Sequence, residues 1–129
     1  MEHGECAARQ AQAMLRGTGF PMGKLAAVQA AERGHMYYSN PGSDPNAIVL
    51  HDADSLDFLG DIGAARLIAL TGAKAPGFAP AVKTLRKFLE DIPPRLITRT
   101  GRRIGAGRAT QLRSFLDRLQ AESAGGSAM

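Results

Sequence analysis

A short segment in the middle of the chain holds the side chains best suited to chemistry. Between residues 51 and 61 it carries one histidine and four aspartates: His51, Asp52, Asp54, Asp57 and Asp61. Aliphatic residues around them recur at helical spacing, which predicts a helix packed into a core. Carboxylates in such a helix are usually hydrogen-bonded, paired with a cation or bound to a metal. The segment therefore predicts a cation beside it.

The helical period decides which of these carboxylates act together. Asp54, Asp57 and Asp61 fall at positions i, i+3 and i+7 and share one face, whereas Asp52 points elsewhere. Imidazole and carboxylate ligands together suit Mn, Fe, Zn, Ni or Mg, and the residue types do not select one of these metals.

The residues from Asp52 to Arg66 read DADSLDFLGDIGAAR. This spelling resembles the late helix of one branch of the HD-domain metal-dependent phosphohydrolases, which reads DADxLDxxGxxGxAR. In that family the second aspartate of the DAD triplet is the last metal ligand, a role that the resemblance assigns to Asp54. The glycines Gly60 and Gly63 also have a local explanation. They let a neighbouring helix approach closely, at a cost of roughly 1 kcal/mol of helix propensity each.

The resemblance extends over most of the chain. Dinuclear members of the family carry two further histidines before the late aspartate, and these map to His3 and His35. The resemblance therefore implies a divalent metal held by Asp54, His35 and His3. It also implies hydrolysis of a nucleotide or another small phosphate ester. Arg66 lies more than three turns beyond Asp54, so we expect it to be a structural partner of Asp57 or Asp61.

The early histidine and the His-Asp doublet of the family pattern have no counterpart ahead of His3. We therefore expect an HD-like domain that is incomplete at its N-terminus and that would act as a metal-dependent phosphohydrolase only if the domain were complete, so its own activity is in doubt. Missing helices would leave apolar surface uncovered, which predicts a homo-oligomer or a partner chain. The alternative function is a non-catalytic helical module for oligomerisation or regulation.

His51-Asp52 is itself a His-Asp dipeptide and offers a second way to align the family pattern. A family doublet is usually followed by capping or turn residues, whereas here the motif continues to Arg66. Reading the segment as the late motif explains more residues, so we favour it.

Charge is distributed unevenly along the 129 residues, whose net charge is +4. Every charged residue from Asp44 to Asp61 is acidic, whereas basic residues dominate from Lys83 onward. This basic half is interpreted as a solvated helical face, or as a surface that attracts phosphate to a nearby site. With few aromatic residues and no tryptophan, nucleic acid is not expected as a partner.

Composition limits the cellular setting. The chain has no apolar run of 18 residues and no secretory signal at its start, so no membrane association is expected. A single cysteine, Cys6, cannot form an internal disulfide, which is consistent with a reducing cytoplasm.

The elements that must position these residues are predicted to be helices, and the fold class is all-α. We expect an HD-domain-like bundle over residues 1–123 and a disordered tail at 124–129. Helices are predicted at about 5–16, 21–33, 44–70, 81–91 and 95–123. The third is expected to kink near Gly60 and Gly63, and the last to break near its glycines, Gly101, Gly105 and Gly107. Gly34 is predicted to cap the second helix, Asp44 to cap the third, and residues 73–80 to form a linker loop.

Overall fold

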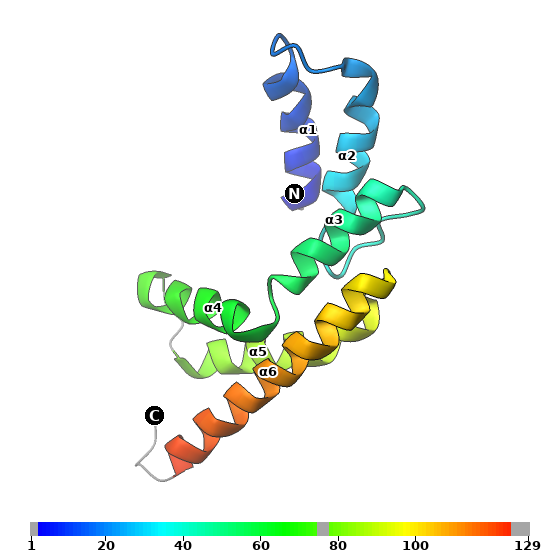
Figure 1. Ribbon diagram of the computed structural model, residues 1–129. Helices are drawn as coiled ribbons and strands as arrows, with labels where there is room; N and C mark the ends of the chain where they lie inside the picture. The colour runs from blue at the N-terminus through cyan, green and yellow to red at the C-terminus, as the bar shows by residue number, and fades with distance from the viewer. Residues whose placement is uncertain (1–2, 75–77, 125–129) are drawn as a thin grey trace. The chain divides into compact units, whose positions relative to one another are not determined.

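The computed structural model describes residues 3–74 and 78–124, and within them the fold is all-α, as predicted (Figure 1). The described residues contain no strand. Their helices are α1 (His3–Leu15), α2 (Leu25–Gly34), α3 (Pro45–Leu56), α4 (Gly60–Lys74), α5 (Phe78–Asp91) and α6 (Arg99–Ala124), with short 3₁₀ turns at Met22–Lys24 and Pro93–Arg95. None of these helices is both long and apolar enough to cross a membrane.

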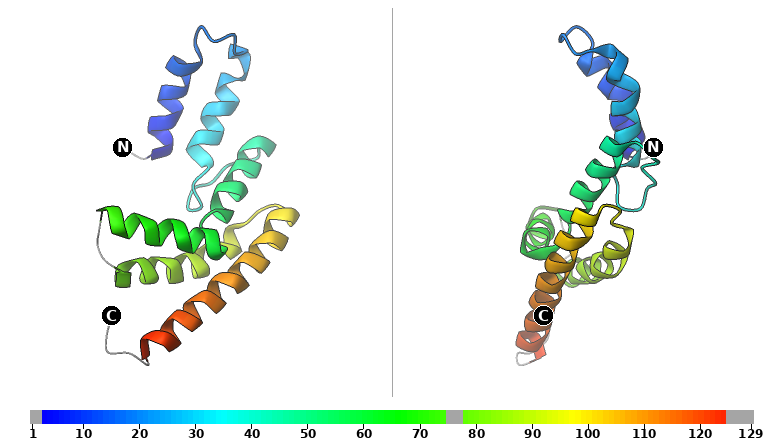
Figure 2. Two further views of the ribbon diagram at one scale, coloured as in Figure 1. Left: turned by 60° about the vertical axis from the view of Figure 1, so that its left-hand side comes forward. Right: turned by 45° about the vertical axis from the view of Figure 1, so that its right-hand side comes forward.

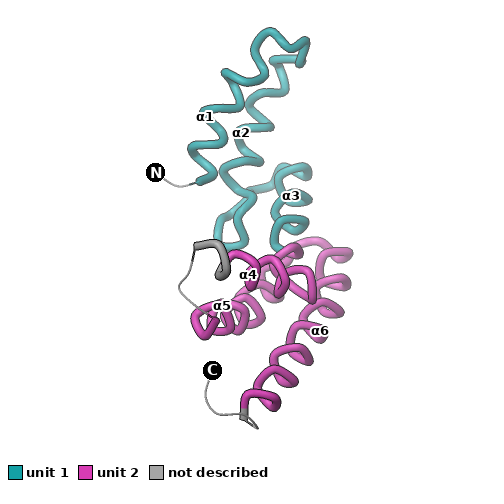
Figure 3. Tube along the Cα trace, turned by 90° about the vertical axis from the view of Figure 1, so that its left-hand side faces the viewer, with its two compact units in different colours: residues 1–55 teal, residues 56–129 magenta. Residues whose placement is uncertain are grey.

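The chain divides into two compact units, residues 1–55 and residues 56–129 (Figure 3). The first contains α1, α2 and nearly all of α3, and the second contains α4, α5 and α6. The two are described separately below. The expected single domain over residues 1–123 stays a prediction.

In the first unit, α1 and α2 lie side by side as an antiparallel hairpin (Figure 1). The sequence GTGFP, Gly17 to Pro21, predicts a turn between the two helices, and the structure has one there. Gly17 and Gly19 both adopt a positive φ, near +80°, and Thr18 donates its backbone N–H and its hydroxyl to the Leu15 carbonyl. A residue with a Cβ is strained at such angles, so the glycines allow the chain to reverse here.

Helix α2 ends differently from the prediction. Gly34 is its last residue and does not have the positive φ of a capping glycine. It is buried, and a Cβ there would lie 2.6 Å from the Pro41 Cα. The glycine is therefore needed for space, because the loop after the helix folds back onto it.

Asp44 begins α3 as predicted. Its Oδ1 accepts hydrogen bonds from the backbone N–H groups of Asn46 (2.8 Å) and Ala47 (3.1 Å), and Pro45 is the first helical residue. A side-chain cap satisfies amides that have no partner within the helix, and proline at this position loses no hydrogen bond.

The predicted long helix over 44–70 is instead two helices. Where a kink was expected, the helix is interrupted. α3 ends at Leu56 and α4 begins at Gly60, whose φ is +75°. A Cβ on Gly60 would lie 3.2 Å from Gln111 Oε1 on α6, and one on Gly63 would lie 2.4 Å from the Phe58 carbonyl. Both glycines are required by the turn between the helices and by its close packing.

In the second unit, α4, α5 and α6 pack against one another around a shared apolar core (Figure 2). The core side chains with almost no exposed surface are Leu59, Leu85, Ile92, Leu96, Leu112 and Leu116. Beside them the Phe58 and Phe88 rings contact each other at a tilt of 50°, with 5.1 Å between centroids. Burying each large aliphatic side chain contributes about 1.5–3 kcal/mol, so this core is the main support of α4 through α6.

The final helix corrects two predictions. α6 begins at Arg99 rather than near Arg95, because the Thr98 hydroxyl caps it by accepting the Gly101 N–H at 2.8 Å. It also runs unbroken through its glycines. Gly105 is buried where the Leu96 side chain packs into the space of its missing Cβ. This packing offsets the low helix propensity of glycine.

The predicted linker at 73–80 is mostly helical in the described residues, since α4 continues through Lys74 and α5 already begins at Phe78. Residues 75–77 lie outside the described residues. So do residues 125–129 of the predicted tail, whereas Ala124 is the last residue of α6.

Candidate functional site

The two predicted histidines lie together at the open end of the hairpin, where α1 begins and α2 ends. The His3 and His35 rings meet edge to face with their centroids 5.5 Å apart. His3 is the first residue of α1, and His35 directly follows α2. The antiparallel packing of the two helices therefore brings them side by side.

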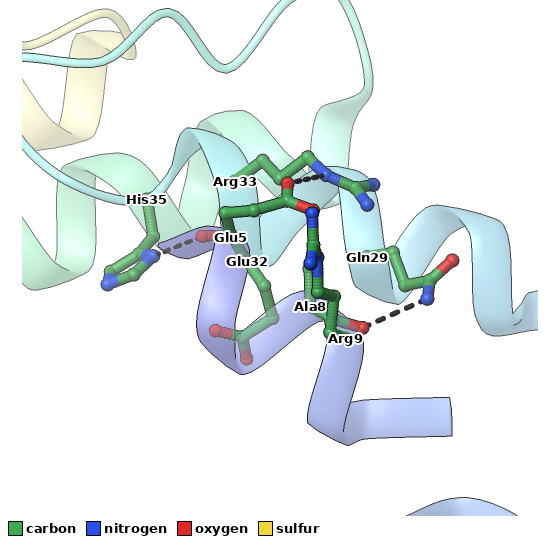
Figure 4. Close-up of polar contacts among 7 residues, drawn as sticks. All are labelled: Glu5, Ala8, Arg9, Gln29, Glu32, Arg33 and His35. Carbon is green, nitrogen blue, oxygen red and sulfur yellow. Dashed lines mark hydrogen bonds and ion pairs between the residues drawn. The ribbon is translucent and has the colours of Figure 1, made fainter. Parts of the chain in front are cut away.

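Two polar contacts fix this helix register (Figure 4). Glu5 Oε2 accepts a hydrogen bond from Arg33 Nε at 2.7 Å, and the Ala8 carbonyl accepts one from Gln29 Nε2 at 2.9 Å. Each step forward along α1 is matched by a step back along α2. Extrapolating the same register to the open end of the hairpin places the first residue of α1 beside the residue after α2.

A close backbone contact supports the same register. Gly4 is buried, and a Cβ at this position would lie 2.5 Å from the Glu32 carbonyl oxygen and 3.3 Å from the Arg33 Cα. Only glycine lets the first turn of α1 approach the last turn of α2 this closely. The histidine pair thus depends on the residue next to His3.

The protonation pattern of His35 follows from its hydrogen bond. Its Nδ1 lies 2.6 Å from the Glu32 carbonyl oxygen (Figure 4). A carbonyl only accepts, so Nδ1 carries the proton, and in the neutral ring Nε2 keeps its lone pair. Histidines that bind metals commonly donate their other N–H to a backbone carbonyl in this way. In the half-buried His35 ring this hydrogen bond leaves the lone pair on Nε2.

Glu5 carries the strongest electrostatic perturbation beside the pair. Hydrogen bonds from Arg33 and Arg9 lower the pKa of the Glu5 carboxyl from 4.5 to about 2. The bond to Glu5 in turn raises the pKa of the Arg33 guanidinium. Glu5 is thus an ionised partner of two arginines, which favours a structural role.

Asp54, the third predicted ligand, is half-buried on the last turn of α3, and its Oδ2 atom is buried. The described residues contain no group of three or more histidine, cysteine or acidic side chains arranged to hold a metal ion. The structure therefore brings His3 and His35 together but does not gather Asp54 with them.

The structure places His51 and Asp52 deep in the interior, where they are 1 % and 3 % exposed. His51 Nδ1 lies 3.4 Å from Asp52 Oδ1, and the His51 carbonyl accepts a 2.6 Å hydrogen bond from the Ser55 hydroxyl. A pair this buried is not accessible to a phosphate ester from solvent. In the sequence this pair stands only as an alternative doublet. The apolar run before it does not signal its burial, because Val49 and Leu50 are themselves exposed.

The other motif residues build the turn after α3. Arg66 Nη1 donates to Asp57 Oδ2 at 3.1 Å, which confirms the predicted structural pairing. Arg108 on α6 donates to the Leu56 carbonyl at 2.6 Å and also approaches Asp57 at 3.8 Å. These contacts give Asp57 and Arg66 a structural role in the turn.

No family model and no curated protein matches this chain.

The fit of a divalent metal can be tested on these residues. His35 offers Nε2 with the tautomer that a metal requires, and His3 lies beside it. Two neighbouring imidazoles fit part of a ligand set for a transition metal, and catalytic zinc sites use three protein ligands. The histidine pair therefore fits as two ligands of a larger set.

Proposed function

We propose that this chain carries the C-terminal part of a divalent-metal phosphohydrolase of the HD type, acting on a nucleotide or another small phosphate ester. The observation that carries the proposal is the 5.5 Å approach of His3 to His35, the two histidines that the family resemblance singled out. Further support comes from the DAD motif, whose last residue, Asp54, lies in the last turn of α3.

In this proposal His3 and His35 provide imidazole ligands. Asp54, which the structure does not gather with them, would provide a carboxylate only after a movement of α3. A bound divalent ion would supply Lewis acidity to a phosphate oxygen and a more acidic water. The Glu32 carbonyl holds the His35 ring in one tautomer and one orientation. Nε2 would therefore bind the ion without a rotation of the ring. In their protonated forms the same imidazoles would donate hydrogen bonds to a substrate phosphate. The early histidine and the doublet of the family pattern would complete the ligand set.

Nitrogen-detected NMR of the two imidazoles tests the ligand assignment directly. Without metal, His35 should show a proton on Nδ1 and a bare Nε2. Adding Zn²⁺ should shift the Nε2 resonances of His35 and His3 and leave those of buried His51 unchanged. Equal shifts of all three histidines, or none, would contradict the assignment. Hydrolysis of a panel of nucleotides with Mn²⁺, compared between native protein and His35→Gln, then tests the reaction.

A second candidate is a non-catalytic helical module for oligomerisation or regulation. It is favoured by the finding that the described residues gather no three-ligand group. This function requires self-association or partner binding that is unchanged by removing metal with a chelator. The metal-site proposal requires a response to metal at His35.

A further inference from the structure

The first unit carries an open groove that the histidine pair does not use. It encloses about 560 Å³ between α2 and α3. It is lined by Phe20, Lys24, Ala27, Val28, Ala31, Glu32, Asn46 and Leu50. Most of these side chains are apolar, and Leu50 leaves 38 % of its surface exposed. A concave apolar surface of this kind marks a place where another molecule packs.

The α2 side of the groove has the pattern of a helix-packing stripe. Within α2, Ala27, Val28, Ala31 and Glu32 follow the spacing i, i+1, i+4 and i+5, which places them along one face, and Lys24 lies in the 3₁₀ turn directly before the helix. The α1-facing residues Gln29 and Arg33 lie on a different face of α2. Two alanines in the stripe allow a second helix to approach closely. The stripe is therefore a second packing face of α2, separate from the one that α1 covers.

The two charges of the stripe have opposite sign and lie at equal distances from its centre. Lys24, directly before α2, precedes Val28 by four residues, and Glu32 follows Val28 by four. In the described residues neither side chain forms an ion pair. A two-fold axis near Val28 would place each Lys24 opposite the Glu32 of a second copy. Self-complementarity of this kind is what a symmetric dimer interface requires.

We propose that this groove is a homodimer interface in which α2 packs antiparallel against α2 of a second copy. Val28 and the flanking alanines form its apolar centre, and two reciprocal Lys24–Glu32 pairs set its direction. Because one short helix face and a few residues of α3 make a small contact, the dimer is weak and depends on concentration. The proposal does not rest on the proposed metal site and concerns a different surface.

Charge reversal followed by sedimentation analysis tests the interface. Lys24→Glu and Glu32→Lys each place like charges opposite one another in a dimer, so each variant alone should dimerise roughly tenfold more weakly or worse. An equimolar mixture of the two variants restores opposite charges across the interface and should form dimers again. The double variant K24E/E32K should also dimerise like the native chain. Arg16→Glu, a charge reversal outside the groove, is the matched control and should change nothing.

The outcomes separate cleanly. Weak single variants, with recovery in the mixture and in the double variant, would establish the antiparallel pairing. A native chain that stays monomeric at all concentrations, or single variants that dimerise like it, would overturn the proposal. So would a mixture that fails to recover. Circular dichroism of each variant confirms folding, and the double variant, with native net charge, keeps the test decisive if a single variant unfolds.

Discussion

The His3 and His35 rings meet edge to face at 5.5 Å because Gly4, directly after His3, packs against the Glu32 carbonyl that holds His35. One backbone oxygen thus orients one histidine and abuts the helix turn that carries the other. The pair results from the packing of α1 against α2, so a change in that packing should move the two rings relative to each other.

Replacing Gly4 tests this dependence. Gly4→Ala places a Cβ 2.5 Å from the Glu32 carbonyl oxygen, so α1 must move away from α2. We expect a loss of about 1–3 kcal/mol in the free energy of unfolding of the hairpin, typical of an overpacked contact. Gly23→Ala is the control, since a Cβ there meets nothing within 4 Å, and it should change stability by less than about 0.5 kcal/mol. Urea unfolding measures both, and equal stabilities would contradict the close contact.

The stability of the hairpin should depend on pH through the ionisation of Glu5. Its carboxyl has a pKa of about 2 when folded, against 4.5 as its ordinary value. A lowered folded pKa contributes stability that is fully present above pH 4.5 and is lost as the pH falls through about 2. Melting temperatures of native protein and Glu5→Gln should therefore differ at neutral pH and converge toward pH 2. A difference that stays constant over this window would rule out the Glu5–arginine pairing as its source.

Replacing two glycines of the second unit by alanine should change the stability of that unit in opposite directions. Gly63→Ala puts a Cβ 2.4 Å from backbone atoms of Phe58 and should destabilise the unit by about 1–3 kcal/mol. Gly107→Ala, on exposed α6 surface with nothing within 4 Å, should stabilise it by about 0.5–1 kcal/mol through helix propensity. Thermal unfolding of the two variants gives the comparison. Destabilisation by Gly107→Ala would show that α6 is not continuous there.

Most of the fold was predictable, because helix signals in this chain are local. Asp44 with Pro45 marked one helix start, and the glycines at 17 and 19 marked the turn between α1 and α2. The errors fell where glycine acts through tertiary contact. Gly105 and Gly34 resemble helix breakers or caps in sequence, yet each provides space for a residue distant in the chain, Leu96 or Pro41.

For the candidate site, the structure places the His3 and His35 rings side by side but does not gather Asp54 with them, and metal binding stays a prediction. His3 and His35 come from the two ends of one hairpin, and a family pattern could pair them before any geometry was known. The burial of His51 and Asp52 could not be derived from their types, because charged and polar residues are rarely so buried. The position of Asp54 relative to the histidines depends on packing beyond its own helix, which residue spacing does not encode.

Calorimetric titration of Zn²⁺ and Mn²⁺ into the full chain tests the metal site most directly. The variants are His35→Gln, Asp54→Asn and, as a matched carboxylate control, Asp57→Asn, whose side chain pairs with Arg66. The proposal predicts that metal draws Asp54 to the histidine pair, so the native chain should bind metal, His35→Gln and Asp54→Asn should lose that binding, and Asp57→Asn should keep it. No binding by the native chain, or equal binding by all four proteins, would contradict it.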